Sequence, residues 1–376
     1  MKHIAFVLFH TGETKALLPT IQNFMNQTDH YRVSIIPVGQ TAKNNLPQSL
    51  NPVIRIPSFI DQGLGQNDEN NISFDDDYVQ EVVSYCQDYQ YIVLGSAAII
   101  QTQIAVALPP TKQRLIYFDI GFDPDRVQNF LPYAEAFFMT SRFAQQDAVA
   151  LIAESKMIKK PAVLLGRHGD IDTWQQQYLD NVKNSTQIRN MLHVEPSDKI
   201  IVWAGRYDVH LSKEGREALA FKLFLDNFKD FAEHYKLRIT LHPGIKGYPE
   251  KKLQALLDDY YIQPLLDSGM DPSHVITQSN TLPAVSIAHA VVSLGSTVGA
   301  QSVCIGTRAK NVYLPDMQPI RGIESVKSEA RWQFLLKSRW PYKKRRKPGT
   351  ASYKRAMHYM GVPSVTTEEV LVAYLG

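Results

Sequence analysis

The sequence predicts an α/β protein built from two doubly wound domains. Short apolar runs of strand length alternate with segments of helical periodicity along most of the chain, and such alternation is typical of parallel sheets covered by helices. A length of 376 residues is long for one core and fits two domains of ordinary size. The alternation starts again after a polar stretch between Gly166 and Asp198, so we expect the domain boundary there.

The first half of the chain contains apolar runs that we predict to be strands, at 3–9, 32–39, 53–59, 91–96, 114–121, 136–141 and 161–166. Apolar residues at helical spacing predict a helix over Thr14–Met25 and another that ends near Leu108. Three aspartates, Asp75 to Asp77, are expected at the start of a helix that ends at Cys86, because acids favour the positive end of a helix dipole.

The second half repeats this alternation, with predicted strands at 199–205, 238–244, 274–279, 290–296 and 311–315. The helices expected between them cover roughly Lys213–Tyr235, Lys251–Leu266, Leu282–His289 and Val298–Cys304. In doubly wound sheets, ligands bind at the carboxyl ends of the strands. The loops that follow the strands are therefore the places to look for functional residues.

The composition indicates a globular protein, with 44% hydrophobic and 20% charged residues. Its apolar runs are too short to span a bilayer. The two cysteines, Cys86 and Cys304, are expected to be reduced and buried in a cytoplasmic protein, and they cannot form a zinc site by themselves. No metal-binding motif stands out, so we expect no metal and no cofactor.

The net charge of +3 hides an uneven distribution, because basic residues are concentrated between Arg321 and Tyr359. The densest part of this segment is Lys343, Lys344, Arg345, Arg346 and Lys347. Such a segment favours an anionic partner, either lipid head groups at the inner face of the membrane or a charged acceptor. A solvated charged surface explains it equally well. Nucleic acid is not expected as a partner, since no recognised binding module surrounds the segment.

The loop after the first strand reads HTGETK, from His10 to Lys15, and Pro19 follows in the expected helix. It resembles the first loop of the non-hydrolysing UDP-N-acetylglucosamine 2-epimerases, in which a Gly-Thr-Arg-Pro-Glu turn precedes a helix that carries Lys and Pro. Glu13 and Pro19 keep the family's spacing, while Lys15 stands one position early. The arginine of the turn is missing, with Thr11 or Gly12 in its place.

Two further segments resemble the same family but depart from it at acidic positions. Gly95-Ser96-Ala97 stands where the epimerases have Gly-Asp-Thr, and YFDIGF places Asp119 where they supply a catalytic Glu. Epimerisation needs acid and base groups on both faces of the sugar, whereas glycosyl transfer needs one base and strong binding of the leaving nucleotide. These departures therefore favour transfer over epimerisation.

In the second half, TLHPGIKG places His242-Pro243 at a strand end, and LGSTVGAQS follows about fifty residues later. The ordered pair resembles the donor site of bacterial capsule and surface-polysaccharide glycosyltransferases of the GT-B type. Backbone N–H groups at a helix start bind anions, and hydroxyls add donors. In the epimerases the matching loop is Ser-Gly-Gly, and Gln301 stands where a ribose-binding Glu is usual. Taken singly, Ser296 and Thr297 fit an ordinary helix cap.

The first strand of the second half ends in WAGRYDVHL, which resembles the His-Arg-Arg loop of the epimerases. Gly205 replaces the His, and Arg206 is kept as a candidate diphosphate clamp. An exposed loop arginine is nearly as good an interpretation of Arg206. Residues 278–282 are a weaker candidate for contact with the nucleobase.

The resemblance implies a GT-B fold of two Rossmann-like domains with a central cleft, and we expect domains at 1–168 and 169–345, with a segment 346–376 that returns to the first domain. It implies a glycosyltransferase that moves a sugar from a nucleotide-sugar donor to a glycan or lipid-linked acceptor in surface-glycan synthesis. The alternatives are a UDP-N-acetylglucosamine 2-epimerase-like enzyme and a non-catalytic binding protein on the same scaffold. Homodimer formation is a further expectation, and the base, the sugar and the acceptor stay open.

The expected roles fall into three sets of residues. The catalytic candidates are Asp119, His10 and Glu13. The nucleotide-binding candidates are Arg206, His242, Pro243, Gly295, Ser296, Thr297 and Gln301. The acceptor-binding candidates are Thr11, Gly12, Lys15 and Ser96.

Overall fold

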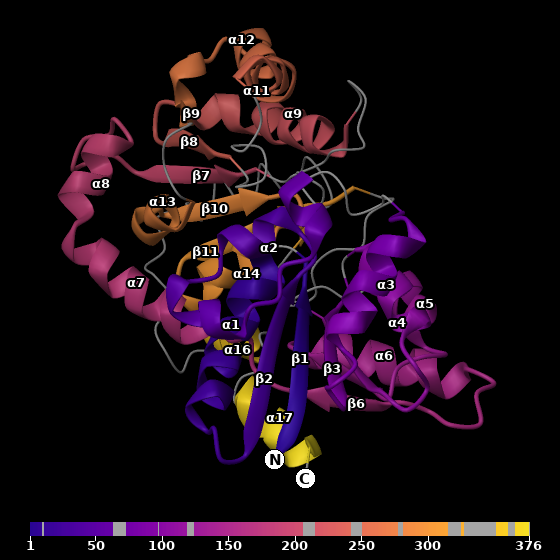
Figure 1. The fold of residues 1–376 in the computed structure, drawn as a ribbon. Helices are drawn as coiled ribbons and strands as arrows, with labels where there is room; N and C mark the ends of the chain where they lie inside the picture. Colours follow the sequence, from indigo (N-terminus) through magenta and orange to yellow (C-terminus); the bar gives the residue numbers. More distant parts are fainter. Residues whose placement is uncertain are drawn as a thin grey trace. The chain divides into compact units, whose positions relative to one another are not determined.

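A computed structural model describes residues 1–9, 11–62, 73–96, 98–118, 124–205, 215–241, 250–276, 281–314, 325–326, 351–359 and 365–375 (Figure 1). The chain divides into two compact units, Met1–Asp170 together with Met360–Gly376, and Ile171–Tyr359. The breaks expected from the sequence are at 168/169 and 345/346. The described residues form one six-stranded sheet in each unit.

The sheet of the first unit has the order β2-β1-β3-β4-β5-β6, and all of its strands are parallel. Its strands are β1 (Lys2–Leu8), β2 (Tyr31–Pro37), β3 (Tyr91–Gly95), β4 (Gln113–Phe118), β5 (Ala136–Met139) and β6 (Ala162–Leu165). These are the apolar runs that the sequence predicted as strands. Strands buried on both faces are wholly apolar, which is why they were recognisable.

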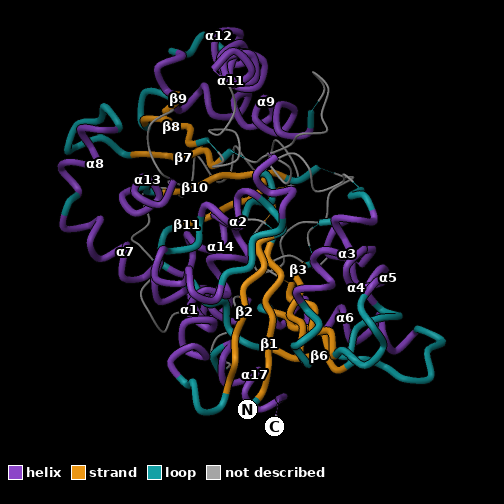
Figure 2. Tube along the Cα trace, viewed as in Figure 1, coloured by secondary structure: helices purple, strands orange, loops and turns teal. Residues whose placement is uncertain are grey.

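Helices cover both faces of this sheet (Figure 2). On one face lie α3 (Asp76–Tyr85), α4 (Ile99–Ala107), α5 (Pro124–Phe130) and α6 (Arg142–Glu154). On the other lie α1 (Thr11–Asn26), α2 (Gln40–Asn44) and the last helix, α17 (Thr367–Leu375). The contacts of α17 with α1 and β6 anchor the end of the chain to the first unit.

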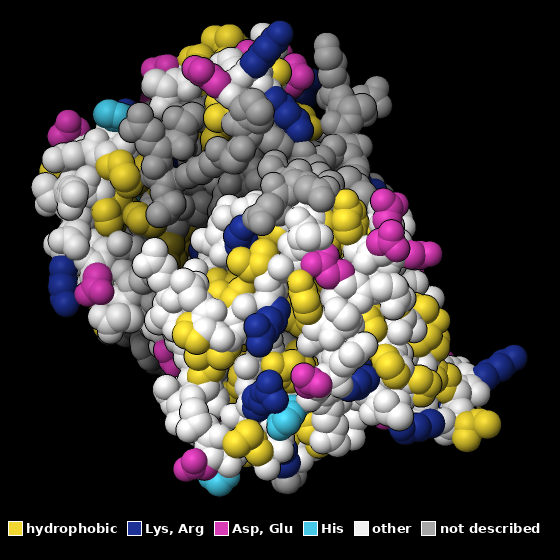
Figure 3. Space-filling view, in the orientation of Figure 1, with side chains coloured by type: hydrophobic (Ala, Val, Ile, Leu, Met, Phe, Trp, Pro, Cys, Tyr) yellow, Lys and Arg dark blue, Asp and Glu magenta, His cyan; other side chains and the backbone are white. Residues whose placement is uncertain are grey.

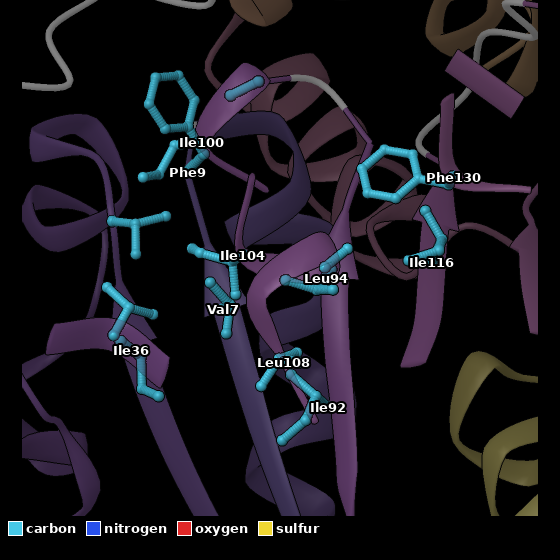
Figure 4. Packing of buried hydrophobic residues seen from close by; sticks show 14 of the residues in the cluster. Val7, Phe9, Ile36, Ile92, Leu94, Ile100, Ile104, Leu108, Ile116 and Phe130 are labelled. Atoms are coloured by element: carbon cyan, nitrogen blue, oxygen red, sulfur yellow. The ribbon is translucent and has the colours of Figure 1, made fainter. Parts of the chain in front are cut away.

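Figure 4 shows how the core of the first unit forms on the side of α4. Val7 of β1 and Leu94 of β3 lie beside Ile104 of α4 and Leu108, the residue that follows this helix, and Ile36 comes from β2. All five side chains are at most 2% exposed. Burial of aliphatic side chains stabilises a fold by about 1.5–3 kcal/mol for each of them, so this layer holds the strands that end at the site described below.

The second sheet has the order β12-β11-β10-β7-β8-β9 and is also parallel. Its strands are β7 (Ile200–Ala204), β8 (Lys236–Thr240), β9 (Val275–Ile276), β10 (Ala290–Ser293), β11 (Arg308–Val312) and β12 (Ser325–Val326). Its helices include α7 (Ile171–Lys183), α8 (Ser185–Met191), α9 (Arg216–Phe228), α11 (Glu250–Leu257), α12 (Gln263–Asp267), α13 (Thr281–Ile287), α14 (Thr297–Cys304) and α16 (Ala351–Tyr359).

The predicted strand at 53–59 is wrong. The chain forms 3-10 turns at Gln48–Val53 (η1) and Ser58–Gln62 (η2), with one isolated parallel bridge between Ile54 and Ile35. Pro52 precedes this run and Pro57 lies within it, and a proline has no amide hydrogen to donate to a ladder. The outer ladder on β2 is therefore limited to a single bridge.

Several other elements differ in their bounds from the prediction. The polar stretch at the domain boundary forms α7 and α8, and the predicted helix over Lys251–Leu266 is interrupted by a π-helical turn at Asp258–Ile262 (η4). Strand β11 occupies Arg308–Val312 instead of 311–315. Its Lys310 is only 4% exposed. Because charged residues are usually exposed, this lysine made the start of the strand hard to recognise from the sequence.

Candidate functional site

Each sheet has one place where the chain order reverses. In the first sheet β1 lies between β2 and β3, and in the second β7 lies between β8 and β10. The loops that leave β1 and β3, and those that leave β7 and β10, lead to helices on opposite faces and open a crevice at the carboxyl ends of the strands. The selected residues that the structure describes follow the strands at these switch points: residues 11–15 follow β1, Ser96 follows β3, and residues 295–301 follow β10.

At the first switch point, Glu13 is bonded to two other elements. The Phe9 N–H at the end of β1 donates to Glu13 Oε1, and Gln101 Nε2 of α4 donates to the same oxygen at 2.8 Å. Gln101 also donates to the Val7 carbonyl at 3.3 Å and accepts from the Ala98 N–H at 3.2 Å. Glu13 is 1% exposed and Gln101 is 0% exposed. The cluster joins β1, α1 and α4.

The glycine at the end of β3 is required by this cluster. A Cβ atom on Gly95 would lie 1.7 Å from Glu13 Oε2 and 2.5 Å from Gln101 Nε2. The Gly-Ser-Ala turn therefore leaves room for a buried carboxylate. Burial and these hydrogen bonds favour a positioning role for Glu13 over the predicted catalytic role, because its bonded oxygen already has two donors.

The other candidates of the first unit occupy varied environments. Asn45 Nδ2 donates to Thr11 Oγ1 at 3.1 Å, which connects the first turn of α1 to the end of α2. Lys15 is exposed and Ser96 is 8% exposed. Gly12 belongs to the first turn of α1. The catalytic candidates His10 and Asp119 lie outside the described residues.

At the second switch point, β10 ends in a turn that begins helix α14. Gly295 has φ 60°, a left-handed conformation that glycine adopts without the strain of a Cβ. Ser296 is the N-cap, and its Oγ accepts from the Val298 N–H at 3.3 Å. Thr297 is exposed and Gln301 is half-buried. The turn thus presents an exposed hydroxyl at the positive end of a helix, where anions bind favourably.

The neighbouring strand at this switch point, β7, is followed by Gly205, which lies beside a buried polar cluster. Glu217 Oε1 of α9 accepts from Trp203 Nε1 at 2.8 Å and from the Tyr261 hydroxyl at 2.9 Å. Glu217 and Trp203 are 0% exposed, and Tyr261 is 1% exposed. Burial, and then the carboxylate of Glu217, raise the pKa of the Tyr261 hydroxyl well above its ordinary value. Tyr261 therefore stays protonated and acts as a donor.

Gly205 is as constrained as Gly95. A Cβ atom at this position would lie 2.4 Å from the Tyr261 hydroxyl oxygen and 3.0 Å from the Thr240 carbonyl oxygen. The Gly205 N–H donates to that carbonyl at 2.9 Å. The Tyr261 hydroxyl thus accounts for the absence of a side chain at the position where the resembling loop has His.

Sequence reasoning missed Glu217 and Tyr261. Tyr261 lies in the π-helical turn, and such turns are frequent at functional sites. The available signals were a glutamate in the first turn of an apolar helix and a tryptophan in a buried strand whose indole N–H needs an acceptor. Neither signal indicates which residues form hydrogen bonds with each other in the folded chain.

Several candidates of the second unit lie outside the described residues. They are Arg206, His242, Pro243 and the basic residues Lys343, Lys344, Arg345, Arg346 and Lys347. Of the candidate base-contact segment, Thr281 and Leu282 begin α13. The nucleotide-binding role of these residues stays a prediction.

Within the described ranges, no three His, Cys, Asp or Glu side chains come together as a metal site would require. The helices described here are all too short or too polar to cross a membrane. Asp75 stands at the N-cap position of α3 without a side-chain cap bond, and Asp76 and Asp77 lie in the first turn. Burial raises the pKa of the thiols of Cys86 and Cys304 to about 12, so neither is a ready nucleophile at neutral pH.

The cap of α14 gives a first prediction. Replacing Ser296 with alanine removes the acceptor for the Val298 N–H, and we expect a loss of about 1 kcal/mol in the stability of the second unit. Thermal melting measures the loss. Asn184 precedes α8 without a side-chain cap bond, so Asn184→Ala is the matched control and should have a smaller effect. Equal effects would argue against the Ser296 cap as a stabilising contact.

Comparison with known proteins gives a match in structure only. No family model matches the chain, and no curated protein matches its sequence. The UDP-GlcNAc 2-epimerase of Methanocaldococcus jannaschii is similar with a TM-score of 0.62 and 12% identity over 100% of both chains. The Neisseria meningitidis UDP-GlcNAc 2-epimerase bound to UDP-GlcNAc has a TM-score of 0.61 and 12% identity over 100% of this chain and 99% of the other.

The N-terminal domain of Candida albicans trehalose-6-phosphate phosphatase is similar to the same degree, with a TM-score of 0.61 and 10% identity over 100% of this chain and 96% of the other. At these identities the likeness establishes the fold alone. The predicted fold class, α/β of the GT-B type with two doubly wound Rossmann-like domains, is confirmed. Because proteins of different description share the fold, the activity has to be argued from the site.

Proposed function

We propose that the chain is a GT-B glycosyltransferase that binds a nucleotide sugar at the switch point of its second sheet and transfers the sugar to a separate acceptor. The observation that supports this best is the Gly295-Ser296-Thr297 turn, which places a helix start and an exposed hydroxyl at the carboxyl end of β10. Backbone N–H groups and a hydroxyl at that position suit the phosphates of a nucleotide. The acceptor would bind at the first unit's loop at 10–15.

The individual roles extend this proposal. Arg206 and His242 would hold the diphosphate, Gln301 would contact the ribose, and Asp119 would act as the base that deprotonates the acceptor hydroxyl. Glu13 would hold the acceptor loop in place through Phe9 and Gln101. The basic residues from Lys343 to Lys347 would attract an anionic acceptor or a membrane surface.

A second candidate function is epimerisation of a UDP sugar. It is supported by the likeness to UDP-GlcNAc 2-epimerases over the whole length of both chains. Three departures weigh against it, since Ser96, Asp119 and Gly205 stand where the resemblance expects Asp, Glu and His. At position 205 the Tyr261 hydroxyl occupies the space of a side chain. We therefore rank transfer first.

The first test is a binding measurement. Thermal melting of the wild type with UDP, CMP, CDP or GDP should show a higher melting temperature with one of them, because a ligand that binds the folded state stabilises it by mass action. In His242→Ala this increase should be largely lost, while Asn184→Ala should keep it. If none of the nucleotides raises the melting temperature, both enzyme proposals fail and a binding protein on this scaffold becomes the better interpretation.

The second test separates the two reactions. Epimerisation at C2 removes and returns the C2 proton, so deuterium from heavy water enters the nucleotide sugar without any acceptor. Glycosyl transfer breaks the C1–O bond and leaves the C2 hydrogen in place. Deuterium at C2 after incubation with the sugar nucleotide selected above would replace our first proposal with the second.

A further inference from the structure

The outer edge of the first sheet carries a groove that is separate from both switch points. It has a volume of about 420 Å³. Its lining includes Tyr31 to Ser34 at the amino end of β2, whereas the candidate site lies at the opposite, carboxyl end of the strands. A volume of this size falls in the range that small-molecule pockets occupy, about 300–1,000 Å³. All of the residues that line the groove belong to the first unit.

The floor of the groove is apolar and closed. Tyr31 and Val33 of β2 are buried, and Met25 and Val53 are half-buried beside them. Ser34 Oγ donates to the Val53 carbonyl at 3.2 Å, which joins the segment after η1 to β2. The groove therefore offers a ligand side chains rather than free main-chain groups, and a floor of this kind favours the apolar part of a ligand.

Two arginines stand at the rim of the groove, on the same face of the sheet. The isolated parallel bridge pairs Ile54 with Ile35, so these two residues share one face. Arg32 is three residues before Ile35, and Arg55 directly follows Ile54, so the alternation places both arginines on the other face. Both are exposed, and both line the groove. Figure 3 shows basic side chains among apolar ones on the face over β1 and β2.

Neither arginine is neutralised within the described part of the chain, where no carboxylate forms an ion pair with either guanidinium. The Arg32 guanidinium lies 5.9 Å from the centre of the Tyr89 ring, and Tyr89 also lines the groove. A guanidinium held against a ring keeps its in-plane N–H donors available, and their fork matches a phosphate or a carboxylate. Two like charges beside one pocket attract an anion.

We propose that this groove is a second ligand site, which binds a small molecule with an apolar body and one phosphate or carboxylate group. The apolar body lies on the floor formed by Tyr31, Val33 and Met25, and the oxyanion is bound by Arg32 and Arg55. An inorganic anion satisfies only the arginines, and a neutral apolar molecule only the floor, so a ligand with both parts is favoured. The site is independent of the proposed nucleotide site, which belongs to the second unit.

The test that reports the position of the ligand is methyl NMR of the full chain, labelled with ¹³C at the methionine methyl groups. The probe is 1-naphthyl phosphate, whose aromatic ring shifts the resonances of methyl groups close to it. We expect the Met25 resonance, assigned with Met25→Leu, to shift along a saturable curve, because Met25 lines the groove. Met139, buried in β5, and Met191, exposed at the end of α8, should keep their resonances.

Two fragments of the probe test the two parts of the groove. 1-Naphthol keeps the apolar body without the phosphate, and inorganic phosphate keeps the anion alone. Each should bind at least about tenfold more weakly than the intact probe. 1-Naphthoate carries a carboxylate in place of the phosphate, so the tighter binder of 1-naphthoate and 1-naphthyl phosphate identifies the anion that the arginines prefer. None of these comparisons requires a change in the protein.

The variants Arg32→Gln and Arg55→Gln should each weaken binding of the probe about three- to tenfold. The matched control is Lys156→Gln, an exposed lysine before β6 at the opposite edge of the sheet, which should leave binding unchanged. His242→Ala, which removes a candidate nucleotide ligand, should also leave the Met25 titration unchanged. A failure of the nucleotide proposal would therefore not remove this site, and the reverse holds as well.

Three outcomes would overturn the proposal. The first is an unchanged Met25 resonance at millimolar probe. The second is binding of 1-naphthol or of inorganic phosphate as tight as that of the probe, which would show a purely apolar groove or a simple anion site. The third is wild-type affinity in both arginine variants, since the anion would then be bound elsewhere.

Discussion

Replacing Glu13 with alanine is expected to destabilise the first unit by about 3 kcal/mol, because it leaves buried donors unpaired and opens a cavity. The donors are the Phe9 N–H and Gln101 Nε2, both of which bond to Glu13 Oε1. Since the chain has two units, unfolding need not be two-state. Hydrogen exchange resolved by peptide is therefore the better measurement. Exchange should accelerate in β1, α1 and α4 and stay unchanged in α14.

The matched control is Glu154→Ala, which removes an exposed carboxylate at the end of α6 and should change nothing. Glu13→Gln distinguishes positioning from catalysis. Both bonds go to one oxygen, and the amide keeps an acceptor oxygen, so the variant should retain most of its stability and most of its turnover. A hundredfold loss of turnover in Glu13→Gln with unchanged exchange would restore the catalytic role predicted from the sequence.

The strands were predictable because burial on both faces selects continuous apolar runs. Runs such as IIVWA in β7 and YIVLG in β3 are short, continuous and rich in β-branched residues, which is typical of buried strands. The wrong strand prediction at 53–59 rested on the same apolar character. The residues VIRI have strand character, but prolines on either side limit how far a ladder can form. At β11, a buried Lys310 contradicted the rule that charged residues are exposed.

The candidate site was predictable in position but not in its supporting contacts. Strand ends and the GST turn identified the second switch point, because glycine and hydroxyl residues before a helix have a local physical meaning. The hydrogen-bond partners of Glu13 and Glu217 could not be predicted from the sequence. Gln101 is 88 residues from Glu13, and Tyr261 is 44 residues from Glu217. No local pattern indicates such contacts, so Glu13, which keeps the spacing of the resembling loop, was interpreted as catalytic, and Glu217 was missed.

The buried carboxylate of the second unit leads to an even larger expected loss. Glu217→Ala should destabilise that unit by about 3–5 kcal/mol, because a buried acceptor shared by two donors disappears and a cavity remains. The Trp203 indole and the Tyr261 hydroxyl would both lose their acceptor. Fluorine NMR of protein labelled with 5-fluorotryptophan would report a shifted or broadened Trp203 resonance, assigned with Trp203→Phe.

Two further variants separate the causes of the stability loss expected in Glu217→Ala. Tyr261→Phe removes one donor, keeps the ring in place and should cost only about 1 kcal/mol. Glu217→Gln keeps the one oxygen that both donors use and should lie between the wild type and Glu217→Ala. Glu233→Ala, an exposed glutamate in the same unit, is the matched control. If Glu217→Ala melts as the wild type does, the cluster does not hold Gly205 in place. The Tyr261 hydroxyl would then be free to move, and the steric argument against a side chain at position 205 would fail with it.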